Sequence, residues 1–174
     1  SDHDDGAFKA INLLVKRGHK RIAHISGPDA LLTSHLRHAA YKKALERNNI
    51  PYDAALVKAT DFSYESTAAA LKELYKATPP TAFFVFKSYI GLDIKRFLQS
   101  NYPKRVQHTD IIGFGNLPLI RQLEIKPTAS LDENSQMMGR QASEILFEKI
   151  KETESQVPSP PRNIIIPCDL IIHE

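Results

Sequence analysis

Thr81-Ala-Phe-Phe-Val-Phe86 is the stretch of sequence that decides the fold. Five apolar residues in a row predict a short strand that is buried on both faces of its sheet. Pro79-Pro80 ends the preceding helix, which we expect to be capped by Ser63 and to run to about Lys76. Another helix is predicted over residues 88–101. This succession indicates a sheet that carries helices on both faces.

The same alternation extends in both directions along the chain. Apolar spacing predicts helices over residues 5–17 and 31–47, and Leu36 and Ala40 are expected on the inward face of the second. The other expected elements are strands over residues 21–26, 55–59, 110–114 and 128–131, a helix over 135–151, a loop over 153–161 and an extended segment over 162–172. The sequence therefore predicts a doubly wound α/β fold with a parallel sheet, whose ligand site lies at the carboxyl ends of the strands.

Composition narrows the class of protein. The 174 residues carry 23 Lys and Arg against 20 Asp and Glu, and the basic residues are scattered rather than gathered into the stripe that nucleic-acid binding needs. The single Cys168 excludes a disulfide within the chain and favours a reducing compartment. No apolar stretch approaches the length of a membrane span, and no signal peptide is recognisable. We expect a cytoplasmic protein.

The sequence lacks the familiar catalytic motifs. Neither a phosphate-binding glycine loop nor a Gly-x-Ser-x-Gly elbow occurs. His35 and His38 are three residues apart but have no nearby third ligand, so a metal site is not expected. Cys168 has no base near it in sequence and is interpreted as an inert buried thiol. We predict a protein that is not an enzyme and needs no cofactor or metal, although an α/β enzyme remains a third possibility.

Polar and aromatic residues follow the expected strands at the edge where a ligand would bind. Arg37 lies in the helix after the first strand, and its planar fork can hold hydroxyls or an anion. Phe62 follows the second strand, where an aromatic ring can cover a sugar. Lys87-Ser88 and Gly115-Asn116 follow the next two strands. The competing interpretation is that Arg37 pairs with a surface carboxylate, Phe62 packs in the core and Ser63 only caps its helix.

Several segments, in order along the chain, resemble the effector-binding part of the lactose/galactose repressor (LacI/GalR) family. The segments that carry the resemblance are Gly18-His19-Lys20-Arg21-Ile22-Ala23, the helix around Arg37 to Tyr41, Pro80-Thr81-Ala82-Phe83, Asp110-Ile111-Ile112-Gly113-Phe114 and Met138-Gly139. The resemblance covers essentially all 174 residues. It implies a fold like that of periplasmic sugar-binding proteins, built of two lobes behind an N-terminal helix-turn-helix domain.

Within that architecture the resemblance divides the chain. Residues 4–131 are expected to form the C-terminal lobe, and residues 132–161 a helix and loop of the other lobe. Residues 162–174 are expected as a terminal extended segment, and the helix-turn-helix domain is absent from the sequence. The helix over 135–151 should therefore lack its natural packing partner.

The resemblance also assigns roles at the ligand site. It implies that Arg37 binds sugar hydroxyls, that Phe62 stacks on the ring and that Glu133 occupies a hinge position where Gln is usual. The chain departs from the family in having Lys87-Ser88 in place of Asn-Asp, and Gly115, before Asn116, in place of Asp. Loss of acceptors and gain of a cation favour an anionic effector such as a sugar phosphate. The competing hypothesis is a pocket that has drifted and binds weakly or not at all.

Partners follow from the same resemblance. The family dimerises through helices that correspond to Leu92–Lys95 and Ile120–Leu123, so Leu92, Lys95, Ile120 and Leu123 are expected at a homodimer interface. A small-molecule effector and operator DNA, contacted through the absent domain, are the other expected partners, and no membrane is involved. The leading hypothesis is the effector-sensing and dimerisation module of a repressor; the alternative is a secreted sugar-binding protein of a transport system.

Overall fold

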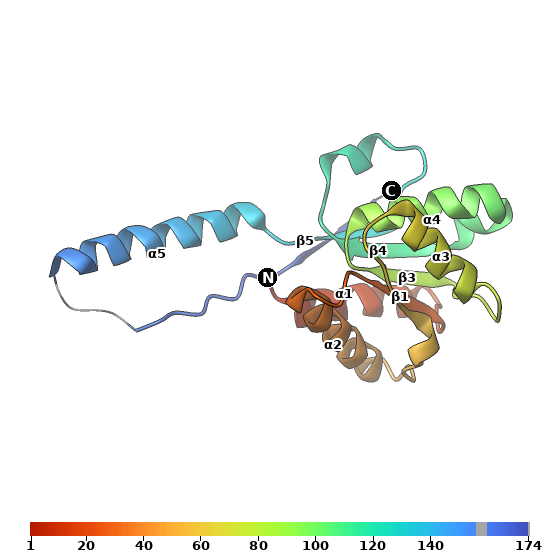
Figure 1. The fold of residues 1–174 in the computed structure, drawn as a ribbon, viewed down its shortest axis with the longest axis horizontal. Helices are drawn as coiled ribbons and strands as arrows, with labels where there is room; N and C mark the ends of the chain where they lie inside the picture. The colour runs from red at the N-terminus through yellow and green to blue at the C-terminus, as the bar shows by residue number, and fades with distance from the viewer. Residues whose placement is uncertain (156–159, 174) are drawn as a thin grey trace.

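A six-stranded sheet with the order β2-β1-β3-β4-β5-β6 organises the chain (Figure 1). The computed structural model describes residues 1–155 and 160–173. The strands are β1 (Ile22–Ser26), β2 (Val57–Ala59), β3 (Ala82–Val85), β4 (Asp110–Phe114), β5 (Ala129–Asp132) and β6 (Asp169–Ile172). The helices are α1 (His3–Lys16), α2 (Leu32–Arg47), α3 (Tyr64–Leu74), α4 (Ser88–Asn101) and α5 (Ser135–Ser155), with short 3-10 helices η1 (Ala54–Leu56), η2 (Pro103–His108) and η3 (Pro118–Gln122).

Strands β1 to β5 run parallel, and β6 adds an antiparallel edge beside β5. The predicted doubly wound α/β fold is confirmed. The strand order changes direction at β1, which has β2 on one side and β3 on the other. The extended segment predicted over residues 162–172 becomes a strand only in its last part, where Ile171 pairs with Ser130. Because β1 to β5 are parallel, their carboxyl ends meet at one edge of the sheet.

Two apolar layers lie on opposite faces of the sheet. Helices α1 and α2 pack on the face that presents Phe84, whereas α3 and α4 pack on the face that presents Phe83 and Val85. Alternate side chains of β3 thus enter different cores, and this alternation explains why its sequence is apolar without interruption. All four side chains of the strand are buried.

Helix α5 has a different environment, because it extends away from the sheet as an arm (Figure 1). Its apolar residues Leu146, Phe147 and Ile150 are exposed, and Phe147 retains 64% of its accessible surface. The helix also continues to Ser155, so the loop predicted from residue 153 begins too early. The rest of that loop includes residues 156–159, which lie outside the described residues. Among the residues described, no helix is both long and apolar enough to cross a membrane.

One expectation about the core is wrong. Leu36, predicted to face inward, is 45% exposed. It lies near the start of α2, where it lines a surface pocket together with residues that include His3 and Ile165. The core contacts of α2 are instead made farther along the helix, by Ala40, Tyr41 and Ala44.

Candidate functional site

The candidate site lies at the carboxyl edge of the sheet, where the strand order changes direction. From β1 the chain passes through α2 to β2 on one side and then crosses to β3 on the other. In open α/β sheets, the point where the strand order changes direction is the usual position of binding sites. Arg37 comes from the first of these connections, and Lys87 lies between the end of β3 and the first residue of α4.

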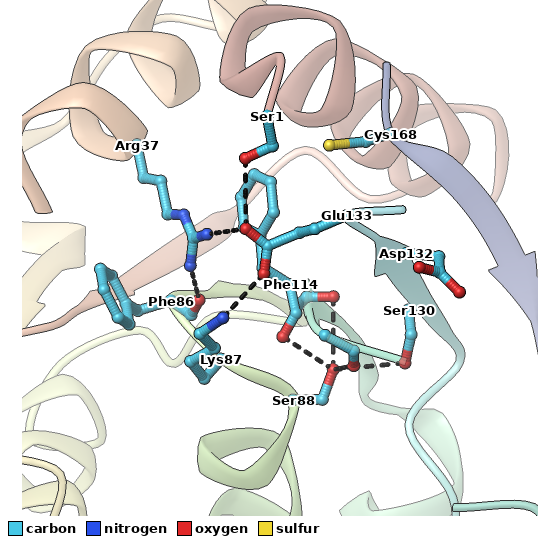
Figure 2. A network of polar contacts seen from close by, with 12 residues as sticks. Ser1, Arg37, Phe86, Lys87, Ser88, Phe114, Ser130, Asp132, Glu133 and Cys168 are labelled. Carbon is cyan, nitrogen blue, oxygen red and sulfur yellow. Dashed lines mark hydrogen bonds and ion pairs between the residues drawn. The ribbon is translucent and has the colours of Figure 1, made fainter. Parts of the chain in front are cut away.

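Arg37 is the central residue of the site, and only 2% of its surface is exposed. Its Nη1 donates to the Phe86 carbonyl oxygen at 2.5 Å, and its Nη2 donates to Glu133 Oε1 at 2.6 Å (Figure 2). The guanidinium carbon lies 3.8 Å from the ring centroid of Phe114 and 4.6 Å from that of Phe86. Burial lowers the pKa of Arg37, against the opposing effect of Glu133. Aromatic faces and two directed hydrogen bonds fix the guanidinium in one orientation.

Glu133 bridges two cations. While Oε1 accepts from Arg37, Oε2 accepts from Lys87 Nζ at 2.7 Å, and the Ser1 hydroxyl lies 3.2 Å from Oε1 (Figure 2). Burial alone would raise the pKa of Glu133, but the hydrogen bond from Lys87 and the charge of Arg37 outweigh it and hold the pKa below its usual range. The carboxylate is therefore ionised at neutral pH and neutralises part of the positive charge at the edge.

A glycine in β4 positions the Lys87-Ser88 turn. A Cβ at Gly113 would lie 2.4 Å from Val85 Cγ2 and 3.2 Å from the backbone of Lys87 and Ser88, so only glycine lets the start of α4 approach so closely. Ser88 is buried, and its hydroxyl bonds to the carbonyl oxygens of Phe114 at 3.1 Å and of Gly115. These bonds tie α4 to β4. Of the predicted pair, Lys87 faces the site, while the Ser88 hydroxyl is committed to the fold.

Phe62 occupies a left-handed backbone conformation with φ of 75°. Its ring is 5.3 Å from that of Phe86 and would touch any side chain added at Gly27. The side chain is half-buried, so one part packs against the edge and another remains accessible. Ser63 beside it caps α3 by accepting from Ser66 N at 3.1 Å. The structural role considered for Ser63 is therefore confirmed.

Gly115 and Asn116 lie after β4 on the far side of the cluster. Gly115 also has positive φ, 93°, and the space above it is open as far as the Lys87 side chain. Asn116 Nδ2 donates to Asp132 Oδ2 at 3.1 Å. Both residues border the edge, but Asn116 turns toward the end of β5 rather than toward Arg37.

The fold thus brings Arg37, Lys87 and Glu133 into direct contact and leaves Phe62 and Asn116 at the periphery. Sequence reasoning selected all three central residues but did not pair them with one another. It also missed Phe86 and Phe114, whose rings flank the guanidinium. The available signal was that each phenylalanine is the last residue of an expected strand and directly precedes a selected pair, Lys87-Ser88 or Gly115-Asn116.

Two of the four predicted dimer-interface residues cannot act as surface contacts. Lys95 is buried, and its ammonium donates to the carbonyl oxygens of Val106 and Thr109 at 2.8 Å each. Ile120 is fully buried as well. Leu92 and Leu123 are half-buried, and Leu117 and Leu119 nearby are exposed.

The other titratable candidates have structural environments. Among the described residues, no group of three or more His, Cys, Asp or Glu side chains is placed to hold a metal ion. His35 is exposed, and His38 stacks on the buried His24 with ring centroids 5.8 Å apart. Cys168 is buried, and burial raises the pKa of its thiol to about 11, so it is a poor nucleophile. His24 was not selected from sequence, and burial lowers its pKa to about 4.

Comparison with known proteins gives a consistent picture. Residues 11–174 match the model of the periplasmic binding protein-like domain. The chain is 27% identical over 174 residues to the HTH-type transcriptional regulator CelR of Thermobifida fusca, covering 99% of this chain and 50% of CelR. It is 30% identical over 172 residues to the HTH-type transcriptional repressor CytR of Escherichia coli K12, covering 98% and 49%. The chain thus spans about half the length of these curated relatives.

Solved structures agree with the sequence relatives. The transcriptional regulator LacI from Bacillus cereus superposes with a TM-score of 0.85 at 29% identity, covering 100% of this chain and 60% of that one. The complex of the transcriptional regulator CelR with cellobiose superposes with a TM-score of 0.82 at 26% identity, covering 98% and 51%. The resemblance drawn from the sequence is confirmed by both kinds of comparison.

Proposed function

Because this chain belongs to the periplasmic binding protein-like domain family, we propose that it is the effector-sensing and dimerisation module of a LacI-type DNA-binding transcriptional regulator. The proposed effector is a sugar or a sugar phosphate. The observation that carries this proposal is the fixed guanidinium of Arg37 at the strand-order reversal, in a chain whose whole length is similar to transcriptional regulators. CelR, which has been solved with cellobiose, supports a sugar as the ligand class.

The proposal extends to the parts of the regulator. Residues 4–131 form the C-terminal lobe, residues 132–161 belong to the second lobe, and residues 162–174 are a terminal extended segment. The exposed apolar residues of α5 support this division, because such a face normally packs against other protein. Operator DNA is contacted through a helix-turn-helix domain outside this sequence, and the protein acts in the cytoplasm without catalysing a reaction.

Dimerisation belongs to the same proposal, at the surface around η3 and α4. With Lys95 and Ile120 buried, the contact is assigned to the accessible apolar residues Leu92, Leu117, Leu119 and Leu123. A sugar-binding protein of a transport system has the same fold and is the alternative. It is disfavoured because the curated relatives are transcriptional regulators.

Calorimetric titration of a sugar panel into the full-length gene product tests the effector, and sedimentation equilibrium tests the dimer. Arg37→Lys keeps the positive charge but loses the planar guanidinium, whose two terminal nitrogens donate in different directions. We expect this substitution to weaken sugar binding at least tenfold. Arg105→Lys, an exposed substitution near the opposite edge of the sheet, is the matched control. Absence of binding by every sugar, with or without a phosphate or carboxylate group, would contradict the proposed function.

A further inference from the structure

We propose that the effector carries an anionic group, a phosphate or a carboxylate on a sugar, and that this anion binds by displacing the Glu133 carboxylate from Arg37 and Lys87. The inference rests on the proposed function and names the chemistry of its ligand. Glu133 is then an internal ligand that occupies the anion position while the effector is absent.

The geometry of the cluster is that of an anion site already filled. One carboxylate oxygen of Glu133 lies 2.6 Å from Arg37 Nη2, and the other lies 2.7 Å from Lys87 Nζ (Figure 2). The two cations therefore stand at the separation needed to hold the two oxygens of a single carboxylate. Phosphate oxygens accept hydrogen bonds from the same donors.

Arg37 makes a neutral replacement unfavourable. Its guanidinium is almost fully buried, and its orientation is set by the Phe86 carbonyl and the two aromatic rings. A sugar hydroxyl that took the place of Glu133 would leave this charge without an anion in a desolvated position. An anionic ligand group preserves the charge balance, so exchange of one anion for another is the favourable route.

Glu133 is also placed so that it can leave. It is the first residue after β5, in the connection to α5, and its side chain is 17% exposed, while that of Lys87 is 36% exposed. The next residue, Asn134, has φ of 52°. Its side-chain Nδ2 anchors the connection by donating to the Pro167 carbonyl oxygen and to the Asp169 carboxylate, each at 3.0 Å. Displacement of Glu133 therefore acts on the connection that sets the direction of α5.

The test is calorimetric titration of the full-length gene product with common hexoses, pentoses and disaccharides. Each sugar is titrated in three forms: the neutral sugar, its phosphate ester and its sugar acid. Inorganic phosphate is a further ligand. We expect one sugar to bind at least tenfold more tightly in a charged form, and the phosphate and acid arms to identify which anion is used. A neutral sugar that binds as tightly as its charged forms overturns this inference but leaves the proposed function standing. Binding of no sugar at all overturns both.

Two variants test the displacement. Glu133→Gln removes the competing charge and is expected to tighten binding of the charged sugar severalfold, whereas Lys87→Met should weaken it at least tenfold. Glu73→Gln and Lys104→Met, both exposed and away from the carboxyl edge, are the matched controls. Weaker binding of the charged sugar by Glu133→Gln would overturn the displacement.

Hydrogen exchange supplies an independent readout. Amides of residues 133–138 should exchange faster when the charged sugar is bound, because Glu133 no longer ties the connection to Arg37 and Lys87. Unchanged or slower exchange in this segment at saturating ligand contradicts the displacement even if the affinities follow the expected order.

Discussion

Both edges of the sheet hold a carboxylate between cationic or donor side chains, but the two carboxylates are held in different ways. At the amino edge, Asp110 accepts from Arg17 at 2.5 Å and from Thr128 at 2.8 Å, and it contacts His19 at 2.8 Å. At the carboxyl edge, Glu133 bridges Arg37 and Lys87.

The difference lies in the backbone beneath each carboxylate. Asp110 begins β4 and is fixed in register opposite Ala82, whereas Glu133 follows the end of β5 and is held in place by side chains. The cations differ as well: the side chain of Arg17 is 51% exposed, whereas Arg37 is buried. The carboxylate of the amino edge is therefore held by the strand pairing of its own residue as well as by side chains, whereas the carboxylate of the carboxyl edge is the one that the proposed effector displaces.

Removal of Arg37 should have the largest effect. We expect Arg37→Met to lower the free energy of unfolding by about 3 kcal/mol, because it leaves the Phe86 carbonyl without its donor and the partly buried Glu133 carboxylate with Lys87 as its one remaining cation. Urea denaturation at neutral pH measures the loss. A loss of unfolding free energy as small as the one expected for Arg17→Ala would show that the arginines of the two edges contribute equally to stability.

Removal of the charge at the amino edge should have the next largest effect. Burial would raise the pKa of Asp110, but hydrogen bonds from Arg17, His19 and Thr128 lower it from 3.8 to about 2. A lowered pKa stabilises the fold above the ordinary value, and this contribution disappears as pH falls from 3.8 through 2. Asp110→Asn should cost roughly 2 kcal/mol at neutral pH and abolish that part of the pH dependence. Denaturant titrations across this pH range provide the measurement.

Glu133→Gln should cost about 1.5 kcal/mol, because the amide oxygen still accepts from Arg37 but the negative charge is lost. The pKa of Glu133 is below its ordinary 4.5, so the lost contribution is one that the wild type shows above that pH and loses as the pH falls below it. Millimolar inorganic phosphate should raise the thermal midpoint of this variant but not that of Asp110→Asn. Equal responses of the two variants would remove the distinction between a replaceable and a permanent carboxylate.

Gly115→Ala tests the backbone of the carboxyl edge without altering its charges. The position has φ of 93°, which costs a residue with a Cβ about 1 kcal/mol. The added Cβ has open space apart from Lys87 Cδ at 3.9 Å, so the cost should come from the backbone alone. Thermal denaturation measures it, and Gly115→Asn should recover part of the loss because Asn tolerates this conformation.

The smallest effect is expected at the exposed cation of the amino edge. Arg17→Ala should change the free energy of unfolding by about 0.5 kcal/mol or less, because solvent screens the pair and His19 and Thr128 remain on Asp110. Paired urea titrations with and without added salt suffice to measure it. A cost comparable to that of Arg37→Met would contradict the view that burial separates the two edges.

The strands and helices could be predicted from the sequence because each depends mainly on the spacing of apolar residues that are close together in the chain. The apolar run of β3 predicted burial on both faces, and both faces are covered. The burial of single helical residues was less predictable. Leu36 shares a face with Ala40 but lies near the start of α2, beyond the well-packed part of the core, so its exposure depends on neighbours distant in sequence.

Lys95 shows the same limit for a charged residue. The family resemblance placed it at a dimer interface, yet the carbonyl oxygens of Val106 in η2 and of Thr109 just after it accept hydrogen bonds from its ammonium inside the chain. No periodicity in the sequence carries that information. Ser88 was selected as a ligand contact because it follows a strand, but the carbonyl oxygens that its hydroxyl contacts come from the end of β4 and the residue that follows it.

The sequence by itself determined the order of strands and helices along the chain and placed Arg37 and Lys87 in connections that follow strands, since these features follow from periods of two and 3.6 residues. Glu133 was selected only through the family resemblance. Only the tertiary structure decided that Glu133 reaches residues 96 and 46 positions away in the chain. That pairing depends on the strand order and on the close approach of α4 to Gly113. Long-range pairing of charges is set by how elements pack, and short-range sequence patterns do not encode it.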